Sequence, residues 1–113
     1  MKLRNAHIAV VERRKVVDYL LNAAHPDNGG KAKFFESLGF SIDDPERLMN
    51  ALLLVARSGE VVESVKSSHG EKYVVDGSIP SQTDTRRGVV RTVWIINRDS
   101  EAPRLVTAYP GKE

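Results

Sequence analysis

The sequence predicts an α+β fold in which three N-terminal helices precede a four-stranded antiparallel sheet. Residues 10–58 carry apolar side chains at helical spacing, whereas residues 61–109 carry short runs rich in β-branched and aromatic residues. Helical and strand segments do not alternate, so the strands should join through turns, with the helices packed on one face of the sheet. A length of 113 residues fits a single domain, residues 1–113, with one hydrophobic core.

Two helices are predicted before residue 40. The first covers residues 10–23, where apolar side chains recur at helical spacing, and it ends before Pro26, which disfavours helix in the preceding residue. The second covers residues 31–38, and Gly39 follows it at the position where a glycine commonly closes a helix.

The third helix has the clearest start signal in the chain. Asp44 can cap the free backbone amides, Pro45 suits the first helical position, and Glu46 favours the positive end of the helix dipole. Ser58 and Gly59 indicate that this helix ends near residue 58.

The strands are predicted from short β-type runs after Gly59. They cover about residues 61–65, 72–75, 88–96 and 104–109. A hairpin-like turn over residues 67–70 joins the first two strands. The polar segment over residues 77–87 is expected to form a long loop, and loops of that length are often functional.

The composition restricts the environment and the chemistry. The chain contains no cysteine, which excludes disulfides and thiolate chemistry and suits a reducing compartment. The longest apolar run, residues 51–56, is far shorter than the roughly 20 residues that a membrane span needs. The basic N-terminus lacks the apolar stretch of a signal peptide. We therefore expect a cytoplasmic protein with no membrane association.

The charge favours an anionic partner only weakly. The net charge of +2 results from 17 basic and 15 acidic residues. Residues 66–104 carry seven of the basic side chains, so the sheet half is mildly the more cationic half.

The third predicted strand carries one charged residue of interest. Both of its faces are largely apolar, which indicates a central strand, and Arg91 interrupts one apolar row. Its guanidinium can simply reach water or a carboxylate at the start of the strand. Alternatively, it forms an anion-binding group held on a rigid strand.

The last strand offers two polar candidates. Period-2 alternation predicts that Leu105, Thr107 and Tyr109 share one face. Thr107 suits a strand because it is β-branched, and Tyr109 suits a half-buried position with a satisfied hydroxyl. Both are also candidates for positioning groups in a site.

The loop before the second helix carries a histidine and a lysine. His25 is a candidate acid–base group or phosphate contact, and Lys31 and the helix N-terminal amides favour an anion. The segment over residues 28–31 is not a Walker loop, because the Lys-Ser/Thr pair and a preceding strand are absent. The alternative is a plain helix connection with an exposed histidine.

No metal or cofactor is predicted. His25, Asp27 and His69 do not have the spacing of a metal-ligand set, and no nucleophile elbow is present. The adjacent carboxylates Asp43 and Asp44 are explained by helix capping.

Several segments together resemble a small bacterial domain family of unknown function. They are Tyr-Leu-Leu at residues 19–21, His-Pro at 25–26, Gly-Lys-Ala-Lys-Phe-Phe at 30–35, Gly-Phe at 39–40, Thr-Val-Trp at 92–94 and Arg-Leu-Val-Thr-Ala-Tyr-Pro at 104–110. The resemblance spans nearly the whole chain. Similar domains occur alone or at the ends of large secreted proteins of the polymorphic-toxin kind, and the layout is similar to RelE/barnase/colicin-type ribonuclease toxins.

The resemblance implies a metal-independent cleavage of RNA. A base would remove the 2′-hydroxyl proton, an acid would protonate the leaving 5′-oxygen, and cations would stabilise the phosphoryl transition state. The residues expected to act are His25 as acid or base, Lys31 and Arg91 as phosphate clamps, and Thr107 and Tyr109 as positioning groups.

The sequence leaves open whether the protein is an enzyme. A ribonuclease-like toxin would act on RNA and would have a cognate antitoxin or immunity protein. A non-catalytic protein-binding module would be a toxin–antitoxin companion or an oligomerising protein such as a homodimer. An enzyme for a small metabolite would need a deep pocket, which a domain of this size forms most readily between subunits.

Overall fold

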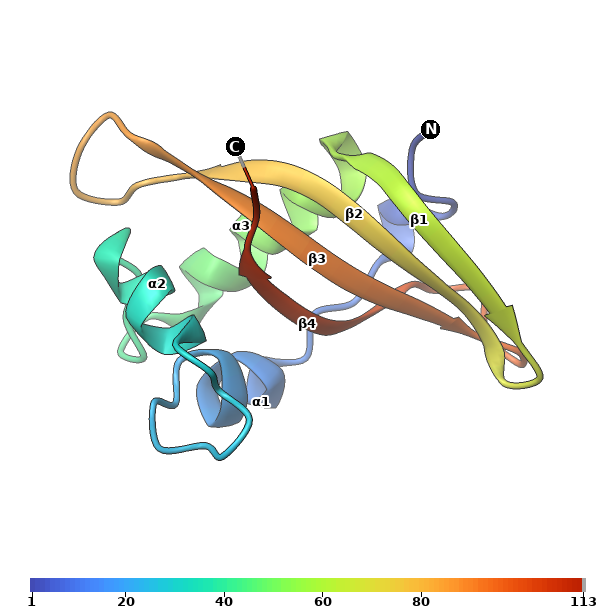
Figure 1. Cartoon of the computed structure of the whole chain (residues 1–113), viewed down its shortest axis with the longest axis horizontal. Helices are drawn as coiled ribbons and strands as arrows, with labels where there is room; N and C mark the ends of the chain where they lie inside the picture. The colour runs from blue at the N-terminus through green and yellow to red at the C-terminus, as the bar shows by residue number, and fades with distance from the viewer. Residues whose placement is uncertain (113) are drawn as a thin grey trace.

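The computed structural model describes residues 1–112 and confirms the α+β fold, with helices first and an antiparallel sheet last (Figure 1). The sheet has the strand order β1-β2-β3-β4, so β3 is an inner strand, as its two apolar faces predict. The elements are η1 (Ala6–Ile8), α1 (Arg13–Lys15), η2 (Val16–Leu20), α2 (Lys31–Ser37), α3 (Pro45–Ser58), β1 (Glu60–Ser67), β2 (Gly70–Pro80), β3 (Arg87–Asn97) and β4 (Arg104–Pro110).

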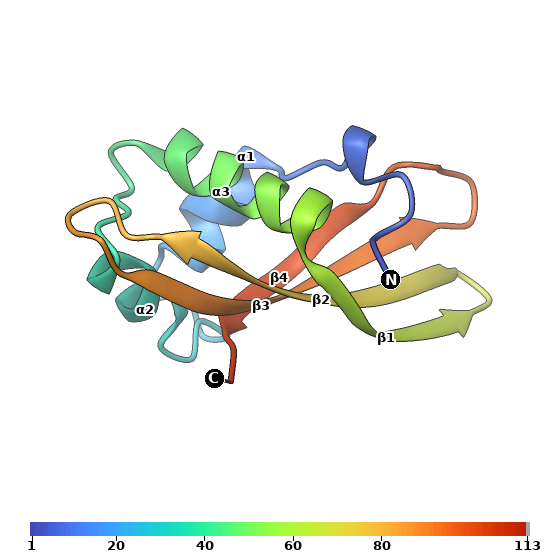
Figure 2. The ribbon, with the colours of Figure 1, turned by 90° about the horizontal axis from the view of Figure 1, so that it is seen from above.

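The core lies between the sheet and α3. Figure 2 shows α3 lying across one face of the sheet, where it packs against β2, and Figure 1 shows α1 and α2 beside β4. Alternate residues of β3 point into this core and are buried, and those between them are half-buried on the opposite face. We call that opposite side of the sheet the open face. The largest fully buried side chains include Trp94, Phe35, Leu20, Leu48 and Leu52.

The first helix is shorter than the helix predicted over residues 10–23. Val10 instead forms a parallel bridge beside β4: its N–H donates to Pro103 O at 2.8 Å, and its carbonyl accepts from Leu105 N at 3.0 Å. An edge strand offers unpaired backbone groups, and this bridge satisfies some of those on β4. The helix that follows becomes a π-turn, in which Leu21 N donates to Val16 O at 2.9 Å.

The end of α2 follows its glycine signal. Gly39 has a φ of 86°, its N–H donates to Glu36 O at 2.9 Å, and Phe40 N donates to Phe35 O at 3.2 Å. These two bonds form a Schellman motif, which a residue without a Cβ adopts most easily. Phe40 is buried just beyond the helix, as this type of helix end favours.

The bounds of α3 agree with the prediction, but Asp44 does not cap the helix as predicted. Pro45 is the first helical residue and the helix ends at Ser58. The Asp44 side chain makes no hydrogen bond to the helix amides and accepts instead from Arg47 Nε at 2.8 Å. The carboxylate is therefore used in an ion pair one turn along the helix.

The polar loop predicted over residues 77–87 is shorter than predicted, because both of its ends are strand. β2 continues to Pro80, β3 begins at Arg87, and only six residues (81–86) connect them. Ile79 is fully buried opposite Gly88, so a single apolar side chain anchors an otherwise polar strand end. The polar residues around Ile79 can adopt strand geometry because they lie near the end of the β2–β3 hairpin.

A β-bulge corrects the predicted face of the last strand. Val93 pairs with Thr107 but Trp94 pairs with Leu105, so one extra residue, Val106, lies between them. Leu105 therefore points into the core, whereas Thr107 and Tyr109 lie on the open face. The prediction that all three share a face is wrong, because period-2 alternation does not reveal a bulge.

Replacing Thr92 with valine is expected to lower the free energy of unfolding by about 1–3 kcal/mol. Thr92 is fully buried; its hydroxyl donates to Val75 O at 2.8 Å and accepts from Trp94 Nε1 at 2.7 Å. Valine keeps the shape but leaves the indole N–H without a partner. Urea unfolding followed by Trp94 fluorescence measures the change, and Val93→Thr on the open face should change stability by less than about 0.5 kcal/mol. Equal losses of stability in Thr92→Val and Val93→Thr would show that the two hydrogen bonds of the Thr92 hydroxyl do not stabilise the fold.

Candidate functional site

The candidate site surrounds Tyr19, at the place where η2 meets the edge of β4. The Tyr19 hydroxyl lies 3.1 Å from Thr107 Oγ1, and the Tyr19 ring meets the His25 ring edge-on with a centroid distance of 4.9 Å. A hollow of about 360 Å³ opens here, and we call it the Tyr19 hollow. Its lining residues are Lys15, Tyr19, His25, Asp27, Val106 and Thr107.

Two ammonium groups flank the Tyr19 ring. Lys15 Nζ lies 5.6 Å and Lys31 Nζ lies 5.5 Å from the ring centroid, within the range of a cation–π interaction. Lys31 also donates to the carbonyls of Asp27 and Asn28, each at 3.2 Å. Within residues 1–112 neither lysine forms an ion pair, so both charges remain available to an anionic ligand.

The hydrogen bonding of His25 fixes its neutral tautomer. Its Nδ1 accepts from Asp27 N at 3.0 Å, which places the ring proton of the neutral imidazole on Nε2. Among the described residues Nε2 has no hydrogen-bond partner. The side chain is half-buried, and His25 can therefore offer a hydrogen-bond donor to a ligand.

Asn28 holds the loop that carries His25. Its side chain is buried; Nδ2 donates to Tyr19 O at 2.6 Å and Leu20 O at 3.3 Å, and Oδ1 accepts from Ala32 N at 2.9 Å. These bonds connect the end of η2 to the first turn of α2. Asn28 therefore positions both Tyr19 and His25, although its place before two glycines suggested only a turn.

Arg91 lies on the open face and is already paired. Its Nε and Nη2 donate to the two carboxylate oxygens of Asp76 at 2.7 and 2.8 Å, and Asp76 stands opposite it on β2. Of the two interpretations of Arg91, this geometry agrees with a guanidinium that reaches a carboxylate. Tyr109 is the residue opposite Arg91 on β4.

The structure thus divides the predicted site residues into two groups. His25, Lys31 and Thr107 gather around Tyr19, whereas Arg91 and Tyr109 lie farther along the open face. Both groups meet at β4, because Thr107 and Tyr109 are two residues apart on the same face. Sequence reasoning missed Lys15 and Tyr19 as site residues, although their spacing of four residues on one helix was a usable signal.

The Arg91–Asp76 pair should make stability depend on pH in acid. Hydrogen bonds from Arg91 hold the pKa of Asp76 below its ordinary value of 3.8. A depressed pKa in the folded state adds stability above the unfolded-state pKa, and this stability is lost as pH falls through the folded-state pKa. In Asp76→Asn, the urea midpoint should therefore fall less steeply below about pH 4 than in wild type. Parallel curves would show that the pair adds no pH-dependent stability.

The described residues contain no group of three or more His, Asp or Glu side chains placed to hold a metal ion. No helix within residues 1–112 is long and apolar enough to cross a membrane.

The fold and site define a small α+β domain with a hollow at the edge of an antiparallel sheet, lined by both polar and apolar side chains. The chain belongs to the DUF6883 family, a domain of unknown function whose model matches residues 2–112. This confirms the resemblance to a family of unknown function. No curated protein matches the sequence.

A solved structure with a similar fold comes from a contact-dependent growth inhibition toxin–immunity protein complex of Klebsiella pneumoniae 342. The superposition has a TM-score of 0.73 and covers 96% of this chain and 98% of the other, at 15% sequence identity. At this identity the likeness establishes the shared fold alone.

Proposed function

We propose that this domain is a toxin-type ribonuclease domain that acts on RNA at the Tyr19 hollow and has a cognate immunity protein as its partner. The observation that carries the proposal is the gathering of an imidazole, two hydroxyls and one unpaired lysine at one hollow, with a second unpaired lysine, Lys31, beside the Tyr19 ring. The fold likeness to a chain from a toxin–immunity complex supports the same class of function.

The geometry supports specific roles for these groups. Lys15 and Lys31 attract the scissile phosphate and stabilise the charge that builds up on its non-bridging oxygens. The 2′-oxygen attacks phosphorus and releases its proton to water as the bond from phosphorus to the 5′-oxygen breaks. The Nε2–H of His25 donates a hydrogen bond to the leaving 5′-oxygen and stabilises the negative charge that develops there. Water supplies the proton that this oxygen takes up, and a 2′,3′-cyclic phosphate and a 5′-hydroxyl result. Tyr19 and Thr107 position the ribose or phosphate through their hydroxyls.

The proposal is tested by incubating the purified domain with total cellular RNA. We expect RNA fragments with 2′,3′-cyclic phosphate ends, unchanged cleavage in the presence of a metal chelator, and growth arrest when the domain is expressed without its immunity partner. Intact RNA together with normal growth would overturn the proposal.

A second candidate function is a non-catalytic protein-binding module. The open face favours it, because Val74, Val89, Val93 and Ile95 are half-buried there and Val65 is 55% exposed. A likeness to one chain of a toxin–immunity complex also suits a companion protein. This function predicts a stable complex or homodimer by light scattering and intact RNA under all conditions. Cleavage that depends on His25 would contradict it.

A further inference from the structure

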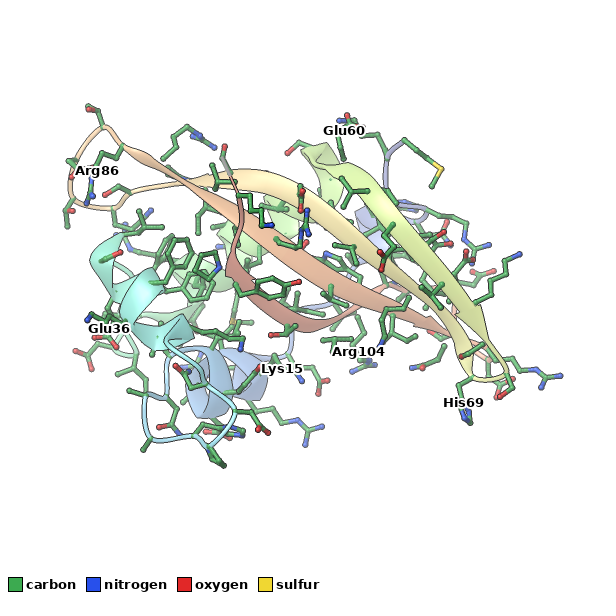
Figure 3. All side chains as sticks on the ribbon, viewed as in Figure 1. Lys15, Glu36, Glu60, His69, Arg86 and Arg104 are labelled. Carbon is green, nitrogen blue, oxygen red and sulfur yellow. The ribbon has the colours of Figure 1, made fainter. Side chains whose placement is uncertain are left out.

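A second polar pocket lies at the far end of the sheet, where the β1–β2 turn meets the β3–β4 turn. Figure 3 marks this tip with His69 and marks the neighbourhood of the Tyr19 hollow with Lys15. The pocket has a volume of about 420 Å³, and we call it the tip pocket. Its lining residues are Arg4, Lys66, Ser67, Ser68, Gly70, Glu71, Ile96, Asn97, Arg98 and Ser100.

The tip pocket has a net positive charge, and its basic side chains form no ion pairs with other described residues. Its lining contains three bases (Arg4, Lys66 and Arg98) and one acid (Glu71), which gives a formal charge of +2. Lys66 stands opposite Glu71 in the β1–β2 register, yet the two form no ion pair. The Glu71 carboxylate accepts instead from the Tyr73 hydroxyl at 2.7 Å.

Most of the other arginines in the chain lie close to a carboxylate, unlike the bases of the tip pocket. Ion pairs hold Arg13, Arg14, Arg47, Arg86, Arg91 and Arg104. In the described chain, Arg4, Lys66 and Arg98 appear in no ion pair, as is also true of Lys15 and Lys31 at the Tyr19 hollow. Three of the bases without an ion pair among residues 1–112 therefore line the tip pocket, and two lie beside Tyr19, while others, such as Arg57 and Lys112, lie elsewhere.

The floor of the tip pocket is backbone. Gly70 has a φ of 148°, and a Cβ at this position would lie 2.2 Å from Ile96 O. The glycine is required for the close approach of the start of β2 to the end of β3, where Gly70 pairs with Asn97. Ser68 and Asn97 add polar groups that can donate to the oxygens of an anion.

We propose that the tip pocket binds a phosphate group of the same RNA strand that the Tyr19 hollow cleaves, through Arg4, Lys66 and Arg98. This inference takes RNA as the ligand from the proposed function. Arginine forks and a lysine ammonium match phosphate oxygens in geometry and charge. Their side chains are exposed, so the pocket can admit one phosphate of a long strand. Free inorganic phosphate offers the same chemistry and is the other possible source.

The test measures binding of a fluorescein-labelled single-stranded RNA by anisotropy, with every protein carrying His25→Ala so that the RNA stays intact. Adding Lys66→Ala and Arg98→Ala is expected to weaken binding at least about tenfold and to reduce the salt slope by about 0.7, the contribution of one phosphate contact on a single strand. Lys66→Arg with Arg98→Lys keeps both charges and should retain most of the affinity.

The matched control is Arg57→Ala with Lys112→Ala, which removes two exposed bases elsewhere that form no ion pair in residues 1–112. The tip assignment is wrong if this pair weakens binding as much as the tip variants do. It is also wrong if inorganic phosphate titrates the pocket by NMR while the RNA affinity does not depend on Lys66 and Arg98.

The same assays separate the two proposals. RNA cleavage by wild type combined with tip-independent binding would refute only the tip assignment. RNA binding that depends on the tip, without any cleavage by wild type, would support the tip assignment and refute the ribonuclease proposal.

Discussion

Replacing His25 with alanine is expected to lower the rate of RNA cleavage by about 10²–10³-fold, the range that losing one hydrogen-bond donor to a developing oxyanion costs. The imidazole lies at the Tyr19 hollow with Nε2 as its donor nitrogen, and alanine offers no replacement. The fold should persist, because the ring is half-buried and its hydrogen bond to Asp27 N is local to the loop. Single-turnover cleavage of a defined RNA, with circular dichroism to verify folding, gives the comparison.

Two further variants separate catalysis from general disturbance. His7→Ala removes an exposed histidine from η1 and should cleave RNA at the wild-type rate. Tyr19→Phe keeps the ring near the two lysines but loses the hydrogen bond to Thr107, so its cleavage rate should fall less than that of His25→Ala. A His25→Ala protein that cleaves RNA like wild type would remove His25 from the mechanism.

Local signals in the sequence were sufficient to predict much of the fold. Gly39 and Pro45 mark helix ends that depend on nearby backbone geometry, and both have the predicted role. The bounds of the first helix could not be predicted from local signals, because Val10 pairs with a strand about 95 residues further along the chain. Helical spacing of apolar residues cannot show that a backbone segment has a better partner in tertiary structure.

The site was predictable only in part for the same reason. His25 and Lys31 stand on a recognisable loop, and Thr107 lies on a recognisable strand. That they meet depends on Tyr19, whose hydroxyl reaches Thr107 across 88 positions of sequence. It also depends on the bulge at Val106, which turns Thr107 away from the core. Neither a contact over this separation nor a bulge has a signature in a single sequence.

The geometry of the Tyr19 hollow rests on a buried amide. Tyr19 belongs to a π-turn, whose terminal carbonyls need partners, and the Asn28 side chain supplies them for Tyr19 and Leu20. The same side chain accepts from Ala32 N at the start of α2. One residue therefore fixes the position of Tyr19 on one side and the His25 loop on the other.

Replacing Asn28 with alanine is expected to lower the free energy of unfolding by about 2–3 kcal/mol, because the buried Leu20 carbonyl and Ala32 amide lose their bonds to Asn28. Urea unfolding followed by Trp94 fluorescence measures this loss. Asn22→Ala is the matched control: its side chain bonds Asp18 O and Ala24 N at exposed positions, so the loss should stay below about 1 kcal/mol. Equal losses in the two variants would show that Asn28 has no special structural role.

Asn28→Asp tests whether the Nδ2 donor of the Asn28 amide, and not only its Oδ1 acceptor, is needed for stability. The new side chain can still accept from Ala32 N, but a carboxylate would face the carbonyls of Tyr19 and Leu20. Burial and these oxygens should raise its folded-state pKa above about 3.9, the value for an unperturbed aspartate. A raised pKa favours the protonated form, so stability relative to wild type should be greatest near pH 4 and should fall as pH rises toward 7. A difference from wild type that stays constant with pH would show that the donor half of the amide is dispensable.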